Sequence, residues 1–266
     1  MEPQFLRGKQ GRLFLMYRPA AGADCKGVVL LIPPFAEEMN KSRRMLALAA
    51  RALTRKGYAT ALPDLHGTGD SDGDFGDAHW DGWVDDIRVV LEWLQERHEA
   101  PVPLLALRAG ALLAARLVAD HAFRPASVVL WNPVTQGKQA LTQFLRLSIA
   151  SSLTGGGGEN TADLRQRLMD GERLEIAGYT LAPALAQGLD QATVAPLVEA
   201  PPERLIWLEV SSRDEPALSP VGQRQVDAWQ SAGVAMIAQA VPGDAFWSTA
   251  ELVDVPELVA ATEAVF

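Results

Sequence analysis

The loop over residues 62–73 carries three kinds of side chain that could do chemistry: a carboxylate, an imidazole and a hydroxyl. Asp64, His66 and Ser71 stand there with the spacing Asp-x-x-Gly-x-Gly-x-Ser. Three glycines within seven residues allow tight turns and positive φ angles. The spacing of the acidic residues does not fit the twelve-residue calcium loop, which ends in a bidentate glutamate. We therefore expect a turn-rich loop and no calcium site.

Residues 105–111 place a charged side chain between an apolar run and a helical pattern. The segment reads Leu-Ala-Leu-Arg-Ala-Gly-Ala, and its charged residue is Arg108. A guanidinium stays protonated and offers only N–H donors, so it can bind an anion but cannot attack a carbonyl group. Arg108 is therefore a candidate binding residue and not a nucleophile.

Residues 32–44 form a third segment that leaves an apolar run and leads into a helical pattern. It reads Ile-Pro-Pro-Phe-Ala-Glu-Glu-Met-Asn-Lys-Ser-Arg-Arg. Asn and Ser are preferred N-cap residues because their side chains accept hydrogen bonds from the first free N–H groups of a helix. We expect Asn40 or Ser42 to be the N-cap, with Phe35 and Ala36 in the loop before it.

Expected strands and helices alternate along the chain and position these segments. Apolar runs of strand length occur at 28–32, 58–62, 102–107, 128–131, 205–210 and 234–241. Most lack polar alternation, which is typical of strands covered on both faces. Helical apolar faces lie between them, around 45–53, 83–94 and 111–118, and Gly57 is the expected C-cap of the first. This pattern predicts an α/β fold with a mostly parallel central sheet and helices on both faces.

The alternation breaks between residue 133 and about residue 190. Helix-like pieces are expected over 140–152 and 162–170, on either side of a flexible loop tip, Gly155–Gly158. We interpret residues 134–190 as a helical cap insertion over one end of the sheet. The core then comprises residues 1–133 and 191–266. An ordinary long connection is the alternative.

Composition narrows the classes of function. The net charge is −9, and the Lys and Arg residues are scattered, which argues against nucleic acid as a partner. No run reaches the roughly 18 apolar residues of a membrane span. The start of the chain lacks the features of a signal peptide, and a lone cysteine, Cys25, allows no internal disulfide. We expect a cytoplasmic protein with no metal and no cofactor.

In this setting the three segments resemble the loops of the α/β-hydrolase superfamily. That superfamily carries Gly-x-Ser-x-Gly at a strand-to-helix turn that exposes the serine nucleophile. This chain has Ala106, Arg108 and Gly110 in the three defined places. The resemblance also implies that an oxyanion hole would use backbone N–H groups of residues 35–36 and of Ala109.

The other two members of the superfamily's catalytic triad follow the serine in the order acid, then histidine. Asp214, in the loop after the run at 205–210, matches the acid position. The chain has His66, His79, His98 and His121, and no histidine after them. The loop where the histidine belongs, 241–247, instead ends in Phe246 and Trp247. The resemblance therefore implies a degenerate triad.

The Pro-Pro-Phe segment, Arg108 and the Phe246–Trp247 pair together resemble one branch of the superfamily. That branch is the second hydrolase associated with the exosortase A system of Gram-negative bacteria. Membership would imply a setting near exopolysaccharide synthesis and the sorting of PEP-CTERM proteins. The family is named as hydrolases by fold, and the name implies no substrate.

Two roles for Arg108 follow from its chemistry. It could be a structural cation paired with Glu37, Glu38 or Asp214, since a buried arginine is almost always paired. It could also be an anion receptor, because a planar guanidinium at the start of a helix suits a carboxylate or a phosphate.

Three functions remain open from the sequence. The first is binding of a small anionic or acyl ligand in the old active-site pocket. That pocket would be formed by Phe35, Ala36, Glu37, Arg108, Ala109, Asp214, Phe246 and Trp247. The second is hydrolysis of an ester or thioester through a rearranged site, with Ser71, Ser211 or Ser212 as nucleophile, or with His66 and His79 as a base or metal pair. We expect both histidines to be capping or surface residues instead. The third is an interaction module for protein partners of the exosortase system.

Overall fold

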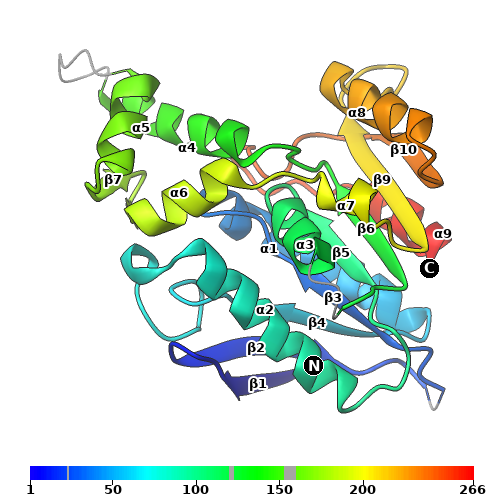
Figure 1. The fold of residues 1–266 in the computed structure, drawn as a ribbon. Helices are drawn as coiled ribbons and strands as arrows, with labels where there is room; N and C mark the ends of the chain where they lie inside the picture. The colour runs from blue at the N-terminus through cyan, green and yellow to red at the C-terminus, as the bar shows by residue number, and fades with distance from the viewer. Residues whose placement is uncertain (23, 120–122, 153–159) are drawn as a thin grey trace.

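A computed structural model describes residues 1–22, 24–119, 123–152 and 160–266. Its centre is a mixed sheet in the strand order β1-β2-β4-β3-β5-β6-β9-β10 (Figure 1). The strands are β1 (Glu2–Arg7), β2 (Arg12–Arg18), β3 (Val28–Ile32), β4 (Ala59–Pro63), β5 (Leu104–Leu107), β6 (Ser127–Trp131), β9 (Arg204–Ser211) and β10 (Met236–Pro242). β2 runs antiparallel to both its neighbours, and all other neighbouring pairs from β4 to β10 are parallel. The predicted fold class is confirmed.

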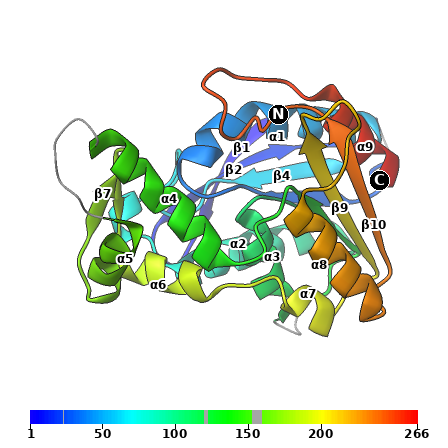
Figure 2. The ribbon, with the colours of Figure 1, turned by 90° about the horizontal axis from the view of Figure 1, so that it is seen from above.

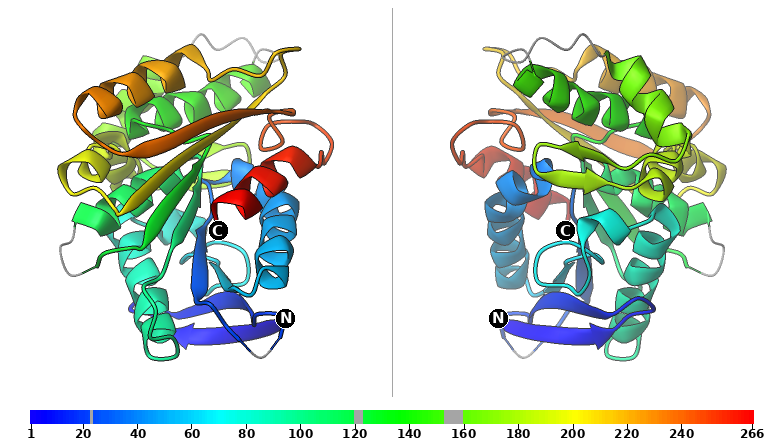
Figure 3. Two further views of the ribbon diagram at one scale, coloured as in Figure 1. Left: turned by 90° about the vertical axis from the view of Figure 1, so that its right-hand side faces the viewer. Right: turned by 90° about the vertical axis from the view of Figure 1, so that its left-hand side faces the viewer.

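Helices cover both faces of this sheet. On one side pack α2 (Trp80–Gln95), α3 (Gly110–Ala119) and α8 (Pro220–Ser231), and on the other α1 (Glu37–Arg55) and α9 (Pro256–Val265) (Figure 3). Because side chains alternate along a strand, Leu104 and Ala106 of β5 enter one core while Leu105 and Leu107 enter the other. This double burial explains why the central strands read as continuous apolar runs.

The chain between β6 and β9 carries a second layer of structure to one side of the sheet (Figure 2). It contains α4 (Gly137–Ser152), α5 (Thr161–Met169), the two-stranded hairpin β7 (Leu174–Ile176) and β8 (Tyr179–Leu181), α6 (Pro183–Gln191) and α7 (Pro196–Glu199). α4 and α5 correspond to the predicted helical pieces, whereas the hairpin was not predicted. The predicted loop tip Gly155–Gly158 lies outside the described residues, and the limits 134–190 for the cap remain a prediction.

Helix α1 begins earlier than the sequence suggested, so the prediction of Asn40 or Ser42 as N-cap is wrong. The N-cap is Ala36, with φ 49°, and it caps without a side-chain hydrogen bond. Two acidic residues, Glu37 and Glu38, fill the first turn, where carboxylates interact favourably with the helix dipole. Asn40 instead donates from Nδ2 to the Tyr179 hydroxyl on β8, over 2.9 Å.

The remaining short element is the 3-10 helix η1 (Phe75–Asp77), which leads from the glycine-rich loop into α2. Gly57 follows α1 with φ +93°, as expected for the residue after a helix C-terminus. Within the described residues, no helix combines the length and apolar character needed to cross a membrane.

Candidate functional site around Arg108

Arg108 stands at the apex of the sharp turn between β5 and α3. Its φ is 53°, a left-handed value that is uncommon outside glycine. The backbone fixes this geometry from three sides: Arg108 N donates to Trp131 O over 3.0 Å, and Arg108 O accepts from Ala111 N and Val134 N. Gly110 allows the turn to pack closely against the end of β3, because a Cβ there would lie only 2.7 Å from Ile32 O. A strained backbone therefore presents this side chain at the carboxyl ends of the strands.

The guanidinium of Arg108 is largely buried, with 14% of its side chain exposed. Nε and Nη2 both donate to Glu38 Oε1, over 3.2 and 3.1 Å. Nη1 donates to Asn132 O over 3.1 Å, and Nη2 also donates to Gln143 Oε1 over 3.3 Å. The charge lies over the Trp247 ring, 4.8 Å from its centroid, which is within range of a cation–π interaction. Four other segments of the chain thus contact this one side chain: α1, the residue after β6, α4 and the segment after β10.

Glu38 is the carboxylate that balances Arg108, out of the three partners suggested by the sequence. Glu37 pairs with Lys41 instead, over 3.2 Å, and Asp214 is exposed in the loop after β9. Burial raises the pKa of Glu38 above its ordinary value, and this desolvation outweighs the opposing effect of Arg108. The positive charge is therefore matched by a carboxylate that is only partly exposed to solvent.

Asn132 was missed by the sequence analysis, although it holds both Arg108 and the neighbouring strand. Its backbone carbonyl accepts from Arg108, and its Oδ1 accepts from Val210 N over 3.0 Å. Its φ is 43°, a conformation that asparagine adopts more readily than most residues. An asparagine directly after a buried strand and before Pro133 was the signal available in the sequence. Gln143, on the exposed side of α4, left no comparable signal.

Two cavities meet at Arg108. The smaller has a volume of about 370 Å³ and lies between the core and α4, while the larger, of about 640 Å³, lies beside the ends of β6 and β9 and the start of α8. Arg108, Val134, Gln143 and Trp247 line both. The smaller cavity has mixed walls. Its apolar part is formed by Phe35, Ala109, Val134, Ala140, Phe144, Leu147 and Trp247, and its polar part by Glu37, Glu38, Lys41, Arg108, Gln143 and Ser248. Both volumes fall in the usual range for small-molecule sites.

Comparison of the chain with known protein families shows the family to which it belongs. Residues 23–166, more than half of the chain, match the family described as serine aminopeptidase, S33. The chain belongs to the S33 family. It is therefore a member of the α/β-hydrolase superfamily, as the sequence resemblance implied. No curated protein matches the chain.

Solved structures of similar fold cover almost the whole S33-family chain. Est1E from Butyrivibrio proteoclasticus, in its structure with ferulic acid bound, has a TM-score of 0.70 at 15% identity, over 98% of this chain and 97% of its own. An alpha-beta serine hydrolase homologue from Coxiella burnetii has a TM-score of 0.59 at 15% identity, over 99% and 95%. XC6422 from Xanthomonas campestris, an a/b serine hydrolase without lid, has 0.60 at 16%, over 99% and 92%. At these identities the likeness shows the fold alone.

Most residues predicted for the site of this S33-family chain lie together. Phe35, Glu37, Ala109 and Trp247 line the smaller cavity with Arg108. Ala36 is buried between Phe35 and the first turn of α1. Two predicted residues lie elsewhere. Phe246 is in the core, where its ring packs 6.3 Å from that of Trp131, and Asp214 is exposed and outside the lining of either cavity.

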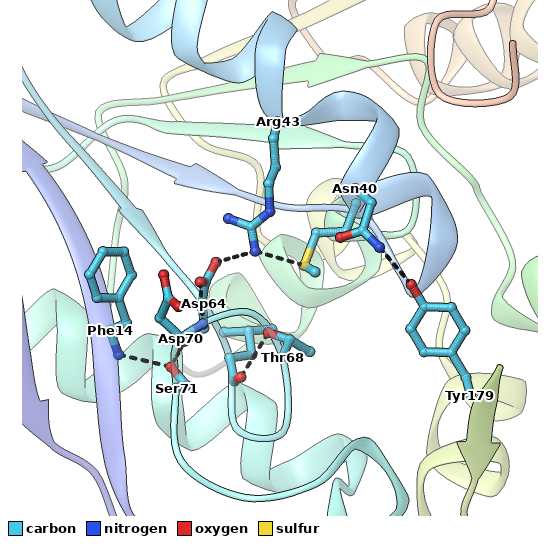
Figure 4. Close-up of polar contacts among 10 residues, drawn as sticks. Phe14, Asn40, Arg43, Asp64, Thr68, Asp70, Ser71 and Tyr179 are labelled. Atoms are coloured by element: carbon cyan, nitrogen blue, oxygen red, sulfur yellow. Dashed lines mark hydrogen bonds and ion pairs between the residues drawn. The ribbon is translucent and has the colours of Figure 1, made fainter. Parts of the chain in front are cut away.

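The glycine-rich loop serves as a structural support in this fold (Figure 4). Asp64 is buried, pairs with Arg43 of α1 over 2.9 Å and accepts from Asp70 N. Ser71 Oγ donates to Asp64 O and accepts from Phe14 N of β2. Ser71, one of the alternative nucleophiles, is thus engaged in tying the loop to strand β2.

The other residues suggested for a rearranged catalytic site do not lie together. His79 caps α2, with Nδ1 accepting from Gly82 N, as expected. His66 is buried instead of capping or lying on the surface, and its backbone N donates to Asp86 while its backbone O accepts from Trp83. Ser211 and Ser212 line the larger cavity. Among the described residues, no group of three His, Cys, Asp or Glu side chains is placed to hold a metal ion.

Proposed function

We propose that this S33-family chain binds a small acyl ligand with an acidic head group around Arg108, and that it does not hydrolyse substrates through a Ser-His-Asp triad. The observation that carries the proposal is the guanidinium at the apex of the turn between β5 and α3. Superfamily enzymes present their serine at this turn. A guanidinium there cannot form an acyl-enzyme, but it can hold a carboxylate or phosphate through paired N–H donors.

The walls of the smaller cavity support an apolar group on the ligand. Phe35 and Phe144 meet edge to face at 4.9 Å between ring centroids, and Leu147 is partly exposed along the rim. Binding an acyl or aryl group there would remove this apolar surface from water, which is favourable by about 25 cal/mol for each Å² buried. The acidic group would then lie at Arg108, where the two cavities meet.

The biological setting that we propose rests on the sequence resemblance. The segment 32–44, Arg108 and the Phe246–Trp247 pair resemble the second hydrolase of the exosortase A system. We propose that the chain acts in the cytoplasm, beside exopolysaccharide synthesis and PEP-CTERM protein sorting. Ferulic acid, bound in the related Est1E structure, combines an aryl group with a carboxyl group and is a suitable probe.

The first experiment separates binding from catalysis. Purified protein is assayed with short-chain p-nitrophenyl esters, acyl thioesters and amino-acid p-nitroanilides, and we expect no turnover above the protein-free blank from either the unmodified chain or the Arg108→Ala variant. Turnover that survives Arg108→Ala and is lost in Ser211→Ala or Ser212→Ala would contradict the proposal. It would favour a hydrolase with a rearranged site in the larger cavity.

The second experiment measures binding by titration calorimetry with octanoate and ferulate. Arg108→Ala removes charge-assisted hydrogen bonds, so we expect affinity to fall by about 10- to 100-fold. Leu147→Asp should also weaken binding, because it replaces an apolar wall residue with a negative charge that repels the acidic group of the ligand. Glu96→Gln is the matched control, since Glu96 lies on the exposed far end of α2. Absence of binding by the unmodified chain would contradict the proposal and favour a protein partner.

A further inference from the structure

We infer that a carboxylate ligand replaces Glu38 as the partner of Arg108, and that Glu38 takes up a proton from solvent as the ligand binds. The inference rests on the proposed function and specifies how that site responds to pH. It follows from the geometry of the Arg108–Glu38 pair and from the charges that surround it.

The first step concerns how Glu38 holds Arg108. A guanidinium and a carboxylate make their strongest contact as a fork, with two parallel N–H···O bonds to two oxygens. Here a single oxygen, Oε1, accepts from both Nε and Nη2. The other two acceptors of Arg108, Asn132 O and Gln143 Oε1, are uncharged. A ligand carboxylate can therefore offer Arg108 a two-oxygen contact that Glu38 does not make.

The second step is that Glu38 and Arg108 face the same cavity. Both line the smaller cavity, and 28% of the Glu38 side chain is exposed. A carboxylate that reaches Arg108 from this cavity must approach Glu38 closely. Two carboxylates that share one cation repel each other, and this repulsion favours protonation of one of them.

The third step is the charge balance around Glu38. From α1, Glu37 and Lys41 face the cavity and already pair with each other. Arg108 comes from the turn between β5 and α3, while α4 and the segment after β10 contribute uncharged side chains, Gln143 and Trp247. The four charged groups therefore cancel, and a bound carboxylate adds one uncompensated negative charge. Glu38 is the carboxylate that loses its contact with Arg108 when the ligand takes its place, and burial already raises its pKa, so we expect Glu38 to take up the proton.

The test is proton linkage measured by calorimetry. Octanoate is titrated into the full chain at about pH 7.5, in two buffers with different heats of ionisation. We expect an uptake approaching one proton for each ligand bound. Octanol, which has the same chain without the charge, should bind with no uptake. In Glu38→Gln the uptake should vanish, while octanoate affinity should equal or exceed that of the unmodified chain, because glutamine is isosteric and does not repel the ligand.

The pH profile gives an independent readout. Octanoate affinity of the unmodified chain should rise by up to about tenfold for each pH unit lowered, until Glu38 is protonated in the free protein. Glu38→Gln should show a flat profile over the same range, and the exposed control Glu96→Gln should keep the slope. Octanoate binding without proton uptake would overturn the inference, as would weaker binding by Glu38→Gln. Failure of octanoate and ferulate to bind at all would instead overturn the proposed function.

Discussion

Arg108 Nε and Nη2 hold one oxygen of Glu38 between the turn after β5 and the first turn of α1. The two residues are 70 positions apart in the chain, and their pair spans the carboxyl ends of neighbouring strands β3 and β5. It joins the segment that would supply an oxyanion hole to the segment that would supply a nucleophile. The pair therefore contributes to stability and to ligand recognition together, and the two contributions can be separated by mutation.

Arg108→Ala should lower the free energy of unfolding by about 2–4 kcal/mol at neutral pH. Removing one partner of a buried ion pair commonly costs about 3–5 kcal/mol, and the partial exposure of Glu38 reduces this figure. Adding Glu38→Gln to Arg108→Ala should restore part of the loss, because no buried charge is then left unpaired. Urea unfolding of the two single variants and the double variant measures the coupling. Additive effects would show that the pair contributes nothing beyond its separate parts.

A second prediction concerns Asp86, a buried residue of α2. Its Oδ2 accepts from His66 N over 2.8 Å, and burial raises the pKa of its carboxyl above the ordinary value. A raised folded-state pKa favours the folded protein at low pH, and this stability is lost as pH rises through that pKa. Asp86→Asn keeps an acceptor for His66 N without a buried charge.

The Asp86→Asn variant should therefore be more stable than the unmodified chain at about pH 8. The difference should disappear below about pH 3, where the aspartate is protonated in both the folded and the unfolded state. Thermal unfolding across this pH range provides the measurement. If the variant were less stable at every pH, the ionised carboxylate of Asp86 would stabilise the folded protein, and the prediction would be wrong.

The sequence predicted the central sheet well because strands covered on both faces leave a strong signal. The run 28–32 coincides with β3, and the run 128–131 differs from β6 by one residue. The edge strand β1 and its neighbour β2 were not predicted. β1 is exposed along most of its length, while β2 is only partly buried, and charged residues stand at the strand ends: Arg7 ends β1, and Arg12 and Arg18 begin and end β2. Their pairing is set by the sheet they join and not by their own composition.

For the site, the sequence identified Arg108 and Trp247 but left three carboxylates as partners of the arginine. Glu37 and Glu38 are adjacent and point about 100° apart on a helix, so the choice depends on where α1 begins. The positive φ of Ala36 sets that start, and no side-chain cap marks it. Asn132, directly after β6, and Gln143, on α4, contact Arg108, and only the folded chain brings these residues together.

A third prediction separates the two roles of Asn132. Asn132→Gly keeps the backbone carbonyl that accepts from Arg108 and tolerates the positive φ, but it loses the side-chain bond to Val210 N. We expect a loss of about 1 kcal/mol in unfolding free energy. Asn132→Ala should cost about 1–2 kcal/mol more, because alanine is strained at this φ. Equal losses from the two variants in urea unfolding would show that the backbone conformation adds no cost.

The last prediction tests whether the turn itself sets ligand affinity. At Gly110 a Cβ would lie 2.7 Å from Ile32 O and 2.8 Å from Pro33 O, and both contacts are backbone atoms that cannot swing aside. Gly110→Ala should move the turn away from β3 and lower the free energy of unfolding by about 1–3 kcal/mol. Octanoate affinity should fall as well, because Arg108 moves with the turn.

Gly233→Ala is the matched control for this variant. Gly233 follows α8 with φ +85°, and nothing lies within 4 Å of its Cβ position, so alanine there adds backbone strain alone. It should cost about 1–2 kcal/mol of stability and leave octanoate affinity unchanged. Urea unfolding and calorimetry on both variants make the comparison. If the two variants lose stability equally and Gly110→Ala still binds octanoate with full affinity, the position of the turn is not what aims Arg108 at the ligand.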